Sequence, residues 1–288
     1  MLFHNRAQCW NRMLSTGVRW HMQCFCLYVF VGAVVGFAQS QEAGRIERAG
    51  NRSTLIVDCP RPMDSAAITL AENCGINVSV EDPPYIFRDD VKDVTAEVAR
   101  TPNPPRRVLV PRGGKLAVDF SVRADGFPDD IRGLIETLVG QANAQFPFAY
   151  RGDPMGGSYV IVPTRMRDAL GNVIEITPLL DRHVDIPLGT RTIAETANLV
   201  TAALSAQTGL HVSCCQAFVA GVPWGGSTIT FEARDESARN VLMRLIAADL
   251  QGKPNHFYWL ERCDPLPSNW CFINLRYASP PASNPLRD

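Results

Sequence analysis

The stretch AENCGINVSV at residues 71–80 returns in similar form as SAQTGLHVSC at residues 205–214. In both stretches a glycine, Gly75 or Gly209, follows residues of helical period and precedes a segment in which apolar and polar residues alternate. A helix C-terminus favours glycine because the residue there often adopts positive φ. Alternation is typical of a half-buried strand. Each stretch therefore predicts the end of a helix, a glycine stop and the start of a strand.

The similarity extends further along both copies. LAVDFSV at residues 116–122 matches STITFEA at residues 227–233. A segment with one apolar stripe of helical period follows in each copy, DDIRGLIETLVGQA in the first and ESARNVLMRLIAADL in the second. Two predicted strands, joined by a turn that contains Asp-Pro, then close each copy. The sequence thus predicts an α+β fold of two tandem small modules, each with two helices packed on small β-sheets.

The first copy carries an insertion. Phe120 and Phe231, which correspond in the two copies, are 111 residues apart, whereas Gly75 and Gly209 are 134 residues apart. The first copy is therefore longer by 23 residues, and the extra length falls within residues 83–115. Loops this long inside a compact unit are often functional. We expect this segment to add an edge strand at its centre and to determine the choice of partner.

The first forty residues have the pattern of a secretory signal peptide. They hold three arginines and no acidic residue, and an uncharged apolar run, CFCLYVFVGAVVGFA, occupies residues 24–38. This run is short for a membrane span, which takes about 20 apolar residues. We expect cleavage after Ser40, and an uncleaved anchor is the alternative.

Charge and composition limit the classes of partner. Without the three leader arginines, 25 basic residues stand against 29 acidic ones, which gives a net charge of −4. A mildly acidic chain without basic runs argues against nucleic acid or an anionic membrane as the main partner. With 46% apolar and 20% charged residues, the chain is expected to be globular. The predicted order is a signal peptide at 1–40, a first module at 41–166 with the insertion at 83–115, a linker or hairpin extension at 167–191, a second module at 192–279 and a flexible tail at 280–288.

The second copy resembles the short N-terminal domain of secretins and TonB-dependent proteins, known as the STN domain. The phrase TGLHV at residues 208–212 and the run ITFEARDESARNVLMRLI at residues 229–246 carry this resemblance, and CGINV at residues 74–78 carries it less fully in the first copy. The resemblance implies a small α+β module of the bacterial periplasm. VEDPPYIF at residues 80–87, with the close of the second copy, also resembles a group of secreted proteins of acidobacteria.

Six cysteines follow the leader. They are Cys59, Cys74, Cys214, Cys215, Cys263 and Cys271. In an oxidising compartment an even number favours disulfides, although six cysteines allow about 15 pairings. Local candidates are Cys263 with Cys271, across a turn, and Cys59 with Cys74, at the two ends of a predicted helix. A zinc site is the alternative, but no C-x-x-C spacing occurs, so we expect no metal.

Catalytic residue patterns are absent from the sequence. Histidine is the usual general base near neutral pH, but His183 and His256 have no nucleophile or second ligand at helical or strand spacing, and strand alternation places His211 at the surface. The G-x-S-x-G pattern of many serine hydrolases does not occur. We therefore expect no enzyme activity, no catalytic residue and no cofactor.

Aromatic and charged residues indicate the candidate interaction surface. They are Trp224, Tyr258, Trp270, Arg88, Asp89 and Asp90. Strand alternation places Tyr258 on the face opposite Phe257 and Trp259, so at least one aromatic side chain is expected to reach the surface, where aromatics often mark a binding face. The alternative is that these aromatics complete a small core, and that the acidic cluster in the insertion is solvated charge.

The function expected from these features is that of an exported scaffold. A protein partner of the bacterial envelope would add a strand to an open sheet edge. Membrane contact is expected only through the transient signal peptide. The alternative is a carrier or sensor that binds a small ligand in the groove between the two modules, with Trp224 as one wall.

Overall fold

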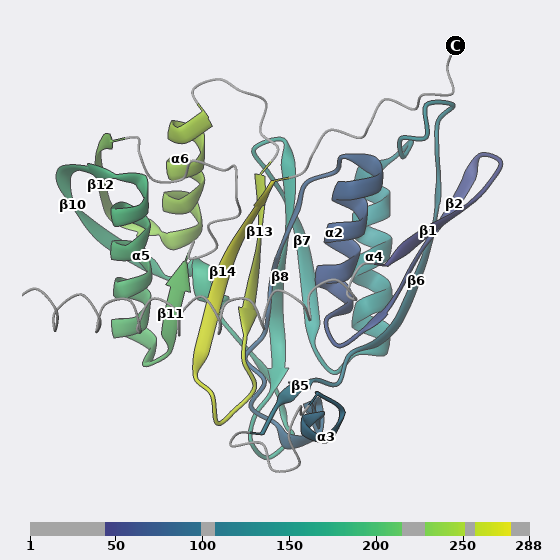
Figure 1. The fold of residues 1–288 in the computed structure, drawn as a ribbon, viewed down its shortest axis with the longest axis horizontal. Helices are drawn as coiled ribbons and strands as arrows, with labels where there is room; N and C mark the ends of the chain where they lie inside the picture. Colours follow the sequence, from purple (N-terminus) through teal and green to yellow (C-terminus); the bar gives the residue numbers. More distant parts are fainter. Residues whose placement is uncertain (1–43, 99–106, 215–227, 251–256, 278–288) are drawn as a thin grey trace, which may run out of the picture. The chain divides into compact units, whose positions relative to one another are not determined.

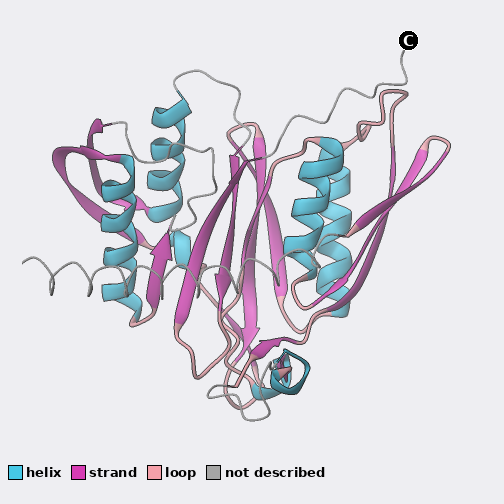
Figure 2. Ribbon diagram, viewed as in Figure 1, coloured by secondary structure: helices cyan, strands magenta, loops and turns pink. Residues whose placement is uncertain are grey.

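The computed structural model describes residues 44–98, 107–214, 228–250 and 257–277 (Figure 1). Five α-helices and 14 strands in these ranges make a mixed α+β fold, as the sequence predicts (Figure 2). The predicted signal peptide and tail, together with Cys215, Trp224 and His256, lie outside the described residues. Within the described ranges, no helix combines the length and apolar character needed to cross a membrane.

Seven elements occur twice in the same order. In the first repeat they are β2 (Arg52–Cys59), α2 (Pro62–Cys74), β3 (Val78–Glu81), β6 (Gly114–Ser121), α4 (Ile131–Gln145), β7 (Ala149–Met155) and β8 (Ser158–Arg167). In the second repeat they are β10 (His183–Thr192), α5 (Ile193–Thr208), β11 (His211–Cys214), β12 (Thr228–Ser237), α6 (Ala238–Leu250), β13 (Phe257–Cys263) and β14 (Trp270–Tyr277). The duplicated order read from the sequence is therefore present in the fold.

Local sequence sets the helix ends. α5 begins with a capping box in which the Thr192 hydroxyl accepts from the Glu195 N–H and the Glu195 carboxylate accepts from the Thr192 N–H. α2 and α5 both end at a glycine of positive φ, Gly75 at 65° and Gly209 at 71°. Because L side chains rarely adopt this conformation, glycine ends the helix at the same place in both copies.

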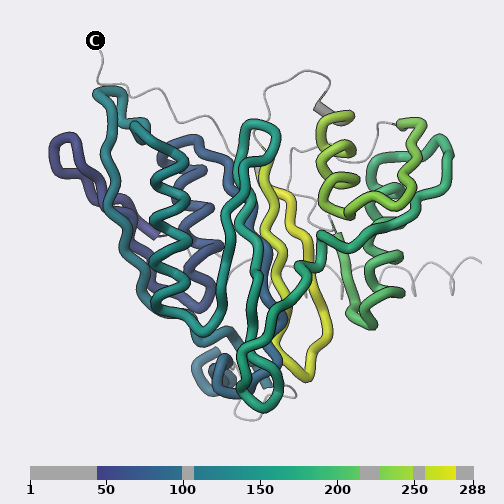
Figure 3. Tube along the Cα trace, turned by 180° about the vertical axis from the view of Figure 1, so that it is seen from behind, coloured from purple at the N-terminus to yellow at the C-terminus, as the bar shows by residue number. Residues whose placement is uncertain are grey.

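The central sheet runs through both repeats in the order β11-β14-β13-β3-β8-β7, with β9 (Val173–Glu175) paired to β8. In each repeat the strand after the glycine runs parallel to the last strand, and the closing hairpin is antiparallel. β3 joins β13 in parallel, with Val80 opposite Leu260. The closing hairpin of the second repeat, yellow in Figure 3, therefore continues the sheet of the first. The repeats are two halves of one sheet within a single compact unit, residues 44–288.

Helices of the two repeats cover opposite faces of this sheet. Tyr258 and Leu260 of the second repeat are buried in one core with α2 and α4, whereas Val160 and Val162 of the first repeat are buried in another core with α5 and α6. β13 is thus covered on both faces. Tyr258, which strand alternation predicts at the surface, is only 3% exposed because the first repeat packs over it.

Two smaller sheets lie on the outer sides of the helices (Figure 1). β1 (Arg45–Ala49), β2 and β6 form a three-stranded sheet next to α2 and α4, and β10 pairs with β12 next to α5 and α6. β10 occupies residues that the sequence assigns to a linker because of Pro187 and Gly189. The strand accommodates them through register shifts between Val184, Ile186 and Gly189.

The insertion forms a small unit of its own. Its elements are η2 (Arg88–Asp90), β4 (Val91–Asp93), α3 (Thr95–Val98) and β5 (Leu109–Pro111). β4 pairs with β5 and with no strand of the larger sheets among the described residues, so the expected extra edge strand is instead a separate hairpin. Tyr85 is buried and contacts Phe148 edge to face, with ring centroids 5.4 Å apart. The start of the insertion is therefore packed on the body of the protein.

Candidate functional site

The boundary between the two repeats contains a cluster of charged side chains, which we call the junction cluster. Its members are Arg61, Asp64, Glu81, Asp82, Asp181, Arg239, Glu261 and Arg262. All except Asp181 have at most 12% of the side chain or residue exposed. Buried charges are costly unless they are paired, so their partners decide what this cluster does.

Arg239 and Arg262 of the second repeat reach carboxylates of the first repeat. The guanidinium of Arg239, on α6, donates to both carboxylate oxygens of Glu81 at 2.8 Å and also pairs with Asp181. Arg262, on β13, donates to Asp64 on α2 at 2.6 Å. Two-point pairing of an arginine with a carboxylate fixes direction as well as distance. These pairs therefore lock the relative position of α6, β13 and the first repeat.

Arg61 of the first repeat makes the reciprocal contact. Its Nε donates to Asp82 at 2.7 Å, and its Nη2 donates to the carbonyl oxygen of Cys263 at 3.0 Å. The Tyr85 hydroxyl donates to the other oxygen of Asp82 at 3.0 Å. Asp82 thus accepts hydrogen bonds from two side chains of the first repeat, the guanidinium of Arg61 and the hydroxyl of Tyr85. Arg61 also donates to the backbone of the second repeat, at Cys263.

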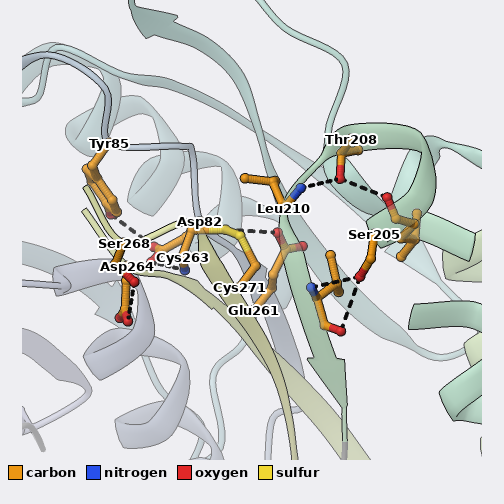
Figure 4. The surroundings of a disulfide bond; sticks show 12 residues. Asp82, Tyr85, Ser205, Thr208, Leu210, Glu261, Cys263, Asp264, Ser268 and Cys271 are labelled. Atoms are coloured by element: carbon orange, nitrogen blue, oxygen red, sulfur yellow. Dashed lines mark hydrogen bonds between the residues drawn. A yellow bond between two sulfur atoms is a disulfide. The ribbon is translucent and has the colours of Figure 1, made fainter. Parts of the chain in front are cut away.

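Glu261 is the one carboxyl group in the cluster that no guanidinium bonds among the described residues. Its Oε2 is buried without a hydrogen-bond partner in the described part of the chain, and its Oε1 lies 3.6 Å from the Sγ of Cys263 (Figure 4). A disulfide sulfur carries no proton, so a hydrogen bond between these atoms requires a protonated Glu261. Burial and the nearby charge of Glu81 raise the pKa of Glu261 well above its usual value.

Other carboxyl groups of the cluster are shifted in the same direction. Burial raises the pKa of Asp64 to about 7, against the opposing effect of Arg262, and burial also raises the pKa of Glu81. Five carboxyl groups share three guanidinium groups in this cluster. The excess negative charge is relieved when protons bind, so the arrangement can couple the junction of the two repeats to pH.

The cysteines follow the sequence predictions in part. Cys263 and Cys271 stand opposite each other on β13 and β14 and form a disulfide, one of the two local pairs expected. Cys59 and Cys74 are thiols. Because α2 stands between them and its 13 residues span about 20 Å, they are too far apart for a bridge. Cys214 is also disulfide-bonded.

One group of metal-ligand residue types gathers in the described ranges. Glu261, Cys263 and Cys271 place a ligand atom each within 4.8 Å of one another. The disulfide removes both thiolates, which are the form of cysteine that binds metal. These residues therefore hold no metal site while the disulfide is closed.

A second candidate site is a row of aromatic rings on β11 and β14, which we call the aromatic row. The rings of His211 and Trp270 stack across the two strands with centroids 4.8 Å apart, and the ring of Phe272 stacks on Trp270 at 5.7 Å. Trp270 is 44% exposed. Phe272 lies opposite Arg262, so the row belongs to the face of the sheet that carries Leu260 and Tyr258. The first repeat covers those two residues, whereas His211 and Trp270 are exposed and Phe272 is half-buried.

The corresponding face of the first repeat is covered. Val80 and Cys214 lie at the same position after the glycine in the two repeats, and they pair with Ile161 and Ile273 respectively. Ile161 therefore corresponds to Ile273, and on the same alignment Ser158 and Val160 correspond to Trp270 and Phe272. Ser158 is 8% exposed, and Val160 is buried in the core formed with α5 and α6. The same surface is thus buried against a neighbouring repeat in one copy, whereas in the other Trp270 is exposed and Phe272 is half-buried.

The sequence-predicted interaction residues do not form one site. Trp270 is exposed on β14 and Tyr258 is buried, while Trp224 lies outside the described residues. Arg88 and Asp89 are exposed on η2 in the insertion, but Asp90 is buried and pairs with Arg167. In this acidic cluster Asp89 is therefore solvated, whereas Asp90 anchors η2 to β8 through its pair with Arg167.

Sequence reasoning missed the junction cluster and did not assign His211 or Phe272 to the candidate interaction surface. One signal was present, since Glu81 and Glu261 each follow an apolar strand segment without a turn residue between. Where a groove between the modules is expected, β3 pairs with β13 and ion pairs join the two repeats. Comparison with known proteins finds no matching family model, no matching curated protein and no matching solved structure.

Proposed function

We propose that this chain is an exported scaffold protein that binds a protein partner of the bacterial envelope through the aromatic row, without catalysis. The observation that carries the proposal is a difference in burial between corresponding surfaces of the two repeats. Val160 of the first repeat is buried against the second repeat, whereas its counterpart Phe272 is half-buried and the neighbouring Trp270 is 44% exposed. Exposed aromatic clusters mark binding faces because they bury large apolar area at low entropic cost.

Export is part of the same proposal. The apolar run at residues 24–38 has the pattern of a signal peptide. Cleavage after Ser40 leaves every described strand whole, since β1 begins at Arg45. The resemblance to the STN domain supports a periplasmic location. Mass spectrometry of the exported protein tests this point, with an N-terminus at Gln41 expected and a retained leader as the contradicting result.

Partner binding is tested by site-specific photo-cross-linking in the producing cell. A photoreactive phenylalanine analogue at position 270 should form a covalent adduct with the partner. The same analogue at position 170 is the matched control, because Leu170 is 84% exposed in the turn between β8 and β9. Equal adducts at both positions, or none at position 270, would contradict the proposal.

Affinity then separates docking from incidental contact. The captured partner, once purified, should bind the wild-type protein saturably, and Trp270→Ala should weaken this binding at least tenfold if Trp270 contributes as a buried aromatic anchor of about 2 kcal/mol. Leu170→Ala should leave the affinity unchanged. No arrangement within the described residues favours the small-ligand alternative.

A further inference from the structure

The two outer edges of the central sheet correspond to the two edges that join at its centre. β3 and β11 occupy the same place in their repeats, and so do β7 and β13. At the centre, β3 pairs with β13. At the ends, β11 and β7 have no further strand among the described elements. A contact between unlike edges can repeat without closing, as head-to-tail interfaces do. The β11 edge of one molecule therefore has the strand type that fits the β7 edge of another.

Backbone groups on the inner edge of β13 show which positions take part in such a junction. Every second residue of an edge strand turns its N–H and C=O outward. In β13 these are Trp259, Glu261 and Cys263. Trp259 N donates to Ser79 Oγ at 3.2 Å, the Glu261 carbonyl accepts from Asp82 N at 3.1 Å, and Cys263 N donates to Asp82 Oδ2 at 3.3 Å.

The matching positions of β7 are Tyr150, Gly152 and Pro154, because Gly152 pairs with Ile161 as Glu261 pairs with Ile273. Two of them are blocked. Asn143 on α4 accepts from the Tyr150 N–H at 2.7 Å and donates to the Tyr150 carbonyl at 3.0 Å. Pro154 has no N–H to offer. The side-chain amide of Asn143 thus takes up both backbone groups of Tyr150, and Pro154 offers no N–H, so a neighbouring strand would lack these hydrogen-bond partners.

The outward side of β11 is blocked in a similar way. Val212 corresponds to Val78, and its N–H donates to the Ser205 hydroxyl on α5 at 2.9 Å (Figure 4). In the first repeat, where β3 does accept a neighbour, the position of Ser205 is taken by Ala71, which has no polar side-chain atom. The outer edge at β11 therefore carries a side-chain cap at a position where the corresponding residue of the first repeat, Ala71, cannot provide one.

We infer that the outer edges fit a second copy of this chain and that Asn143, Pro154 and Ser205 act as caps that prevent head-to-tail assembly. Tyr150 and Pro154 correspond to Trp259 and Cys263, whose N–H groups donate across the centre of the sheet to Ser79 and Asp82. This correspondence points to one partner type, a molecule with the same repeat, rather than to an arbitrary extended peptide. The inference does not depend on the function proposed for the aromatic row.

The test releases each edge separately. Ser205→Ala frees β11, and Asn143→Ala with Pro154→Val frees β7. Ser205→Ala is expected to leave the fold intact, since Ala71 occupies the same place in the first repeat. Sedimentation velocity of the purified proteins should show a monomer for the wild type and for each single-edge variant. A mixture of the two single-edge variants should give a one-to-one dimer that grows no further.

The variant with all three substitutions should form longer assemblies whose size increases with protein concentration. Circular dichroism and urea unfolding confirm that each protein is folded. Folded single-edge variants that remain separate when mixed would overturn the inference, and so would assembly of the wild type or of one single-edge variant alone. If the triple variant does not fold, the mixture experiment decides.

Discussion

Glu81 and Glu261 lie in register on neighbouring parallel strands, and both are buried where the two repeats meet. Glu81 accepts two hydrogen bonds from the Arg239 guanidinium, and no guanidinium in the described part of the chain bonds Glu261. Two carboxylates so close in a dry environment do not both ionise, since each disfavours the charge of the other. Burial and the charge of Glu81 therefore raise the pKa of Glu261, and the junction binds a proton more tightly than the unfolded chain does.

The first prediction is that stability falls as pH rises. The folded protein holds protons on Glu261 and Asp64 at pH values where the unfolded chain, with pKa values near 4.5 and 3.8, has lost them. Because the folded state binds more protons, this contribution is complete below pH 4 and is lost as the pH rises toward and beyond 7. Each excess proton contributes a slope of about 1.4 kcal/mol per pH unit.

Urea unfolding at a series of pH values measures this slope. Glu261→Gln keeps the shape and removes the proton equilibrium, so its stability should depend less on pH by up to about 1.4 kcal/mol per unit. Glu175→Gln, at an exposed glutamate of β9, is the control and should follow the wild type. Parallel pH profiles for Glu261→Gln and wild type would exclude this account.

The second prediction concerns Arg239. Arg239→Met leaves Glu81 buried without its cation and should lower the free energy of unfolding by about 3–5 kcal/mol near neutral pH. Arg234→Met is the matched control, because Arg234 is 83% exposed and its pair with Glu232 on the same strand contributes less than about 1 kcal/mol. A similar loss for both variants in urea unfolding would be inconsistent with the cluster as the lock between repeats.

The third prediction separates the two tryptophans of the closing hairpin. Trp259 is fully buried in the second core, so Trp259→Ala should cost about 3–5 kcal/mol of stability. Trp270→Ala should cost less than about 1 kcal/mol, because much of its ring already faces solvent. Thermal unfolding of both variants measures the difference, and a large loss for Trp270→Ala would show that the aromatic row serves packing instead of binding.

The fourth prediction concerns the disulfide. The disulfide joins Cys263 and Cys271, which are 8 residues apart in sequence, and it restricts the unfolded chain by closing this short loop. Removing the bond should therefore lower the free energy of unfolding by about 2–3 kcal/mol. The double variant Cys263→Ala, Cys271→Ala, compared with wild type under non-reducing urea unfolding, measures this loss. Cys59→Ala is the control for a cysteine without a bridge. An unchanged midpoint for the double variant would count against a structural role.

The fifth prediction concerns the insertion. Val91 and Pro111 stand opposite each other, so a turn of about two residues can replace residues 92–110 without moving the chain on either side. The shortened protein should keep its urea midpoint. Tyr85→Ala should destabilise it by about 3 kcal/mol, since Tyr85 is buried against Phe148 and Asp82. Loss of folding on shortening would show that the hairpin supports the body of the protein.

The amino-acid sequence alone determined the local features. The glycine stops at Gly75 and Gly209, the helical stripes, the alternating strands and the duplication all depend on residues close in the chain, so periodicity and φ preference are enough to predict them. The Cys263–Cys271 pair was also predictable, because a short turn brings its ends together. The exposure of Trp270 was one of two readings that strand alternation left open.

Only the tertiary structure decided how the copies combine. Alternation assumes one buried face per strand, and it failed at Tyr258 because β3 pairs with β13 and places a helix layer on each side of the sheet. Pairing between strands about 180 residues apart depends on edge geometry that no local pattern encodes. The same pairing buries Glu81 beside Glu261, so the proton-binding junction exists only in the assembled fold.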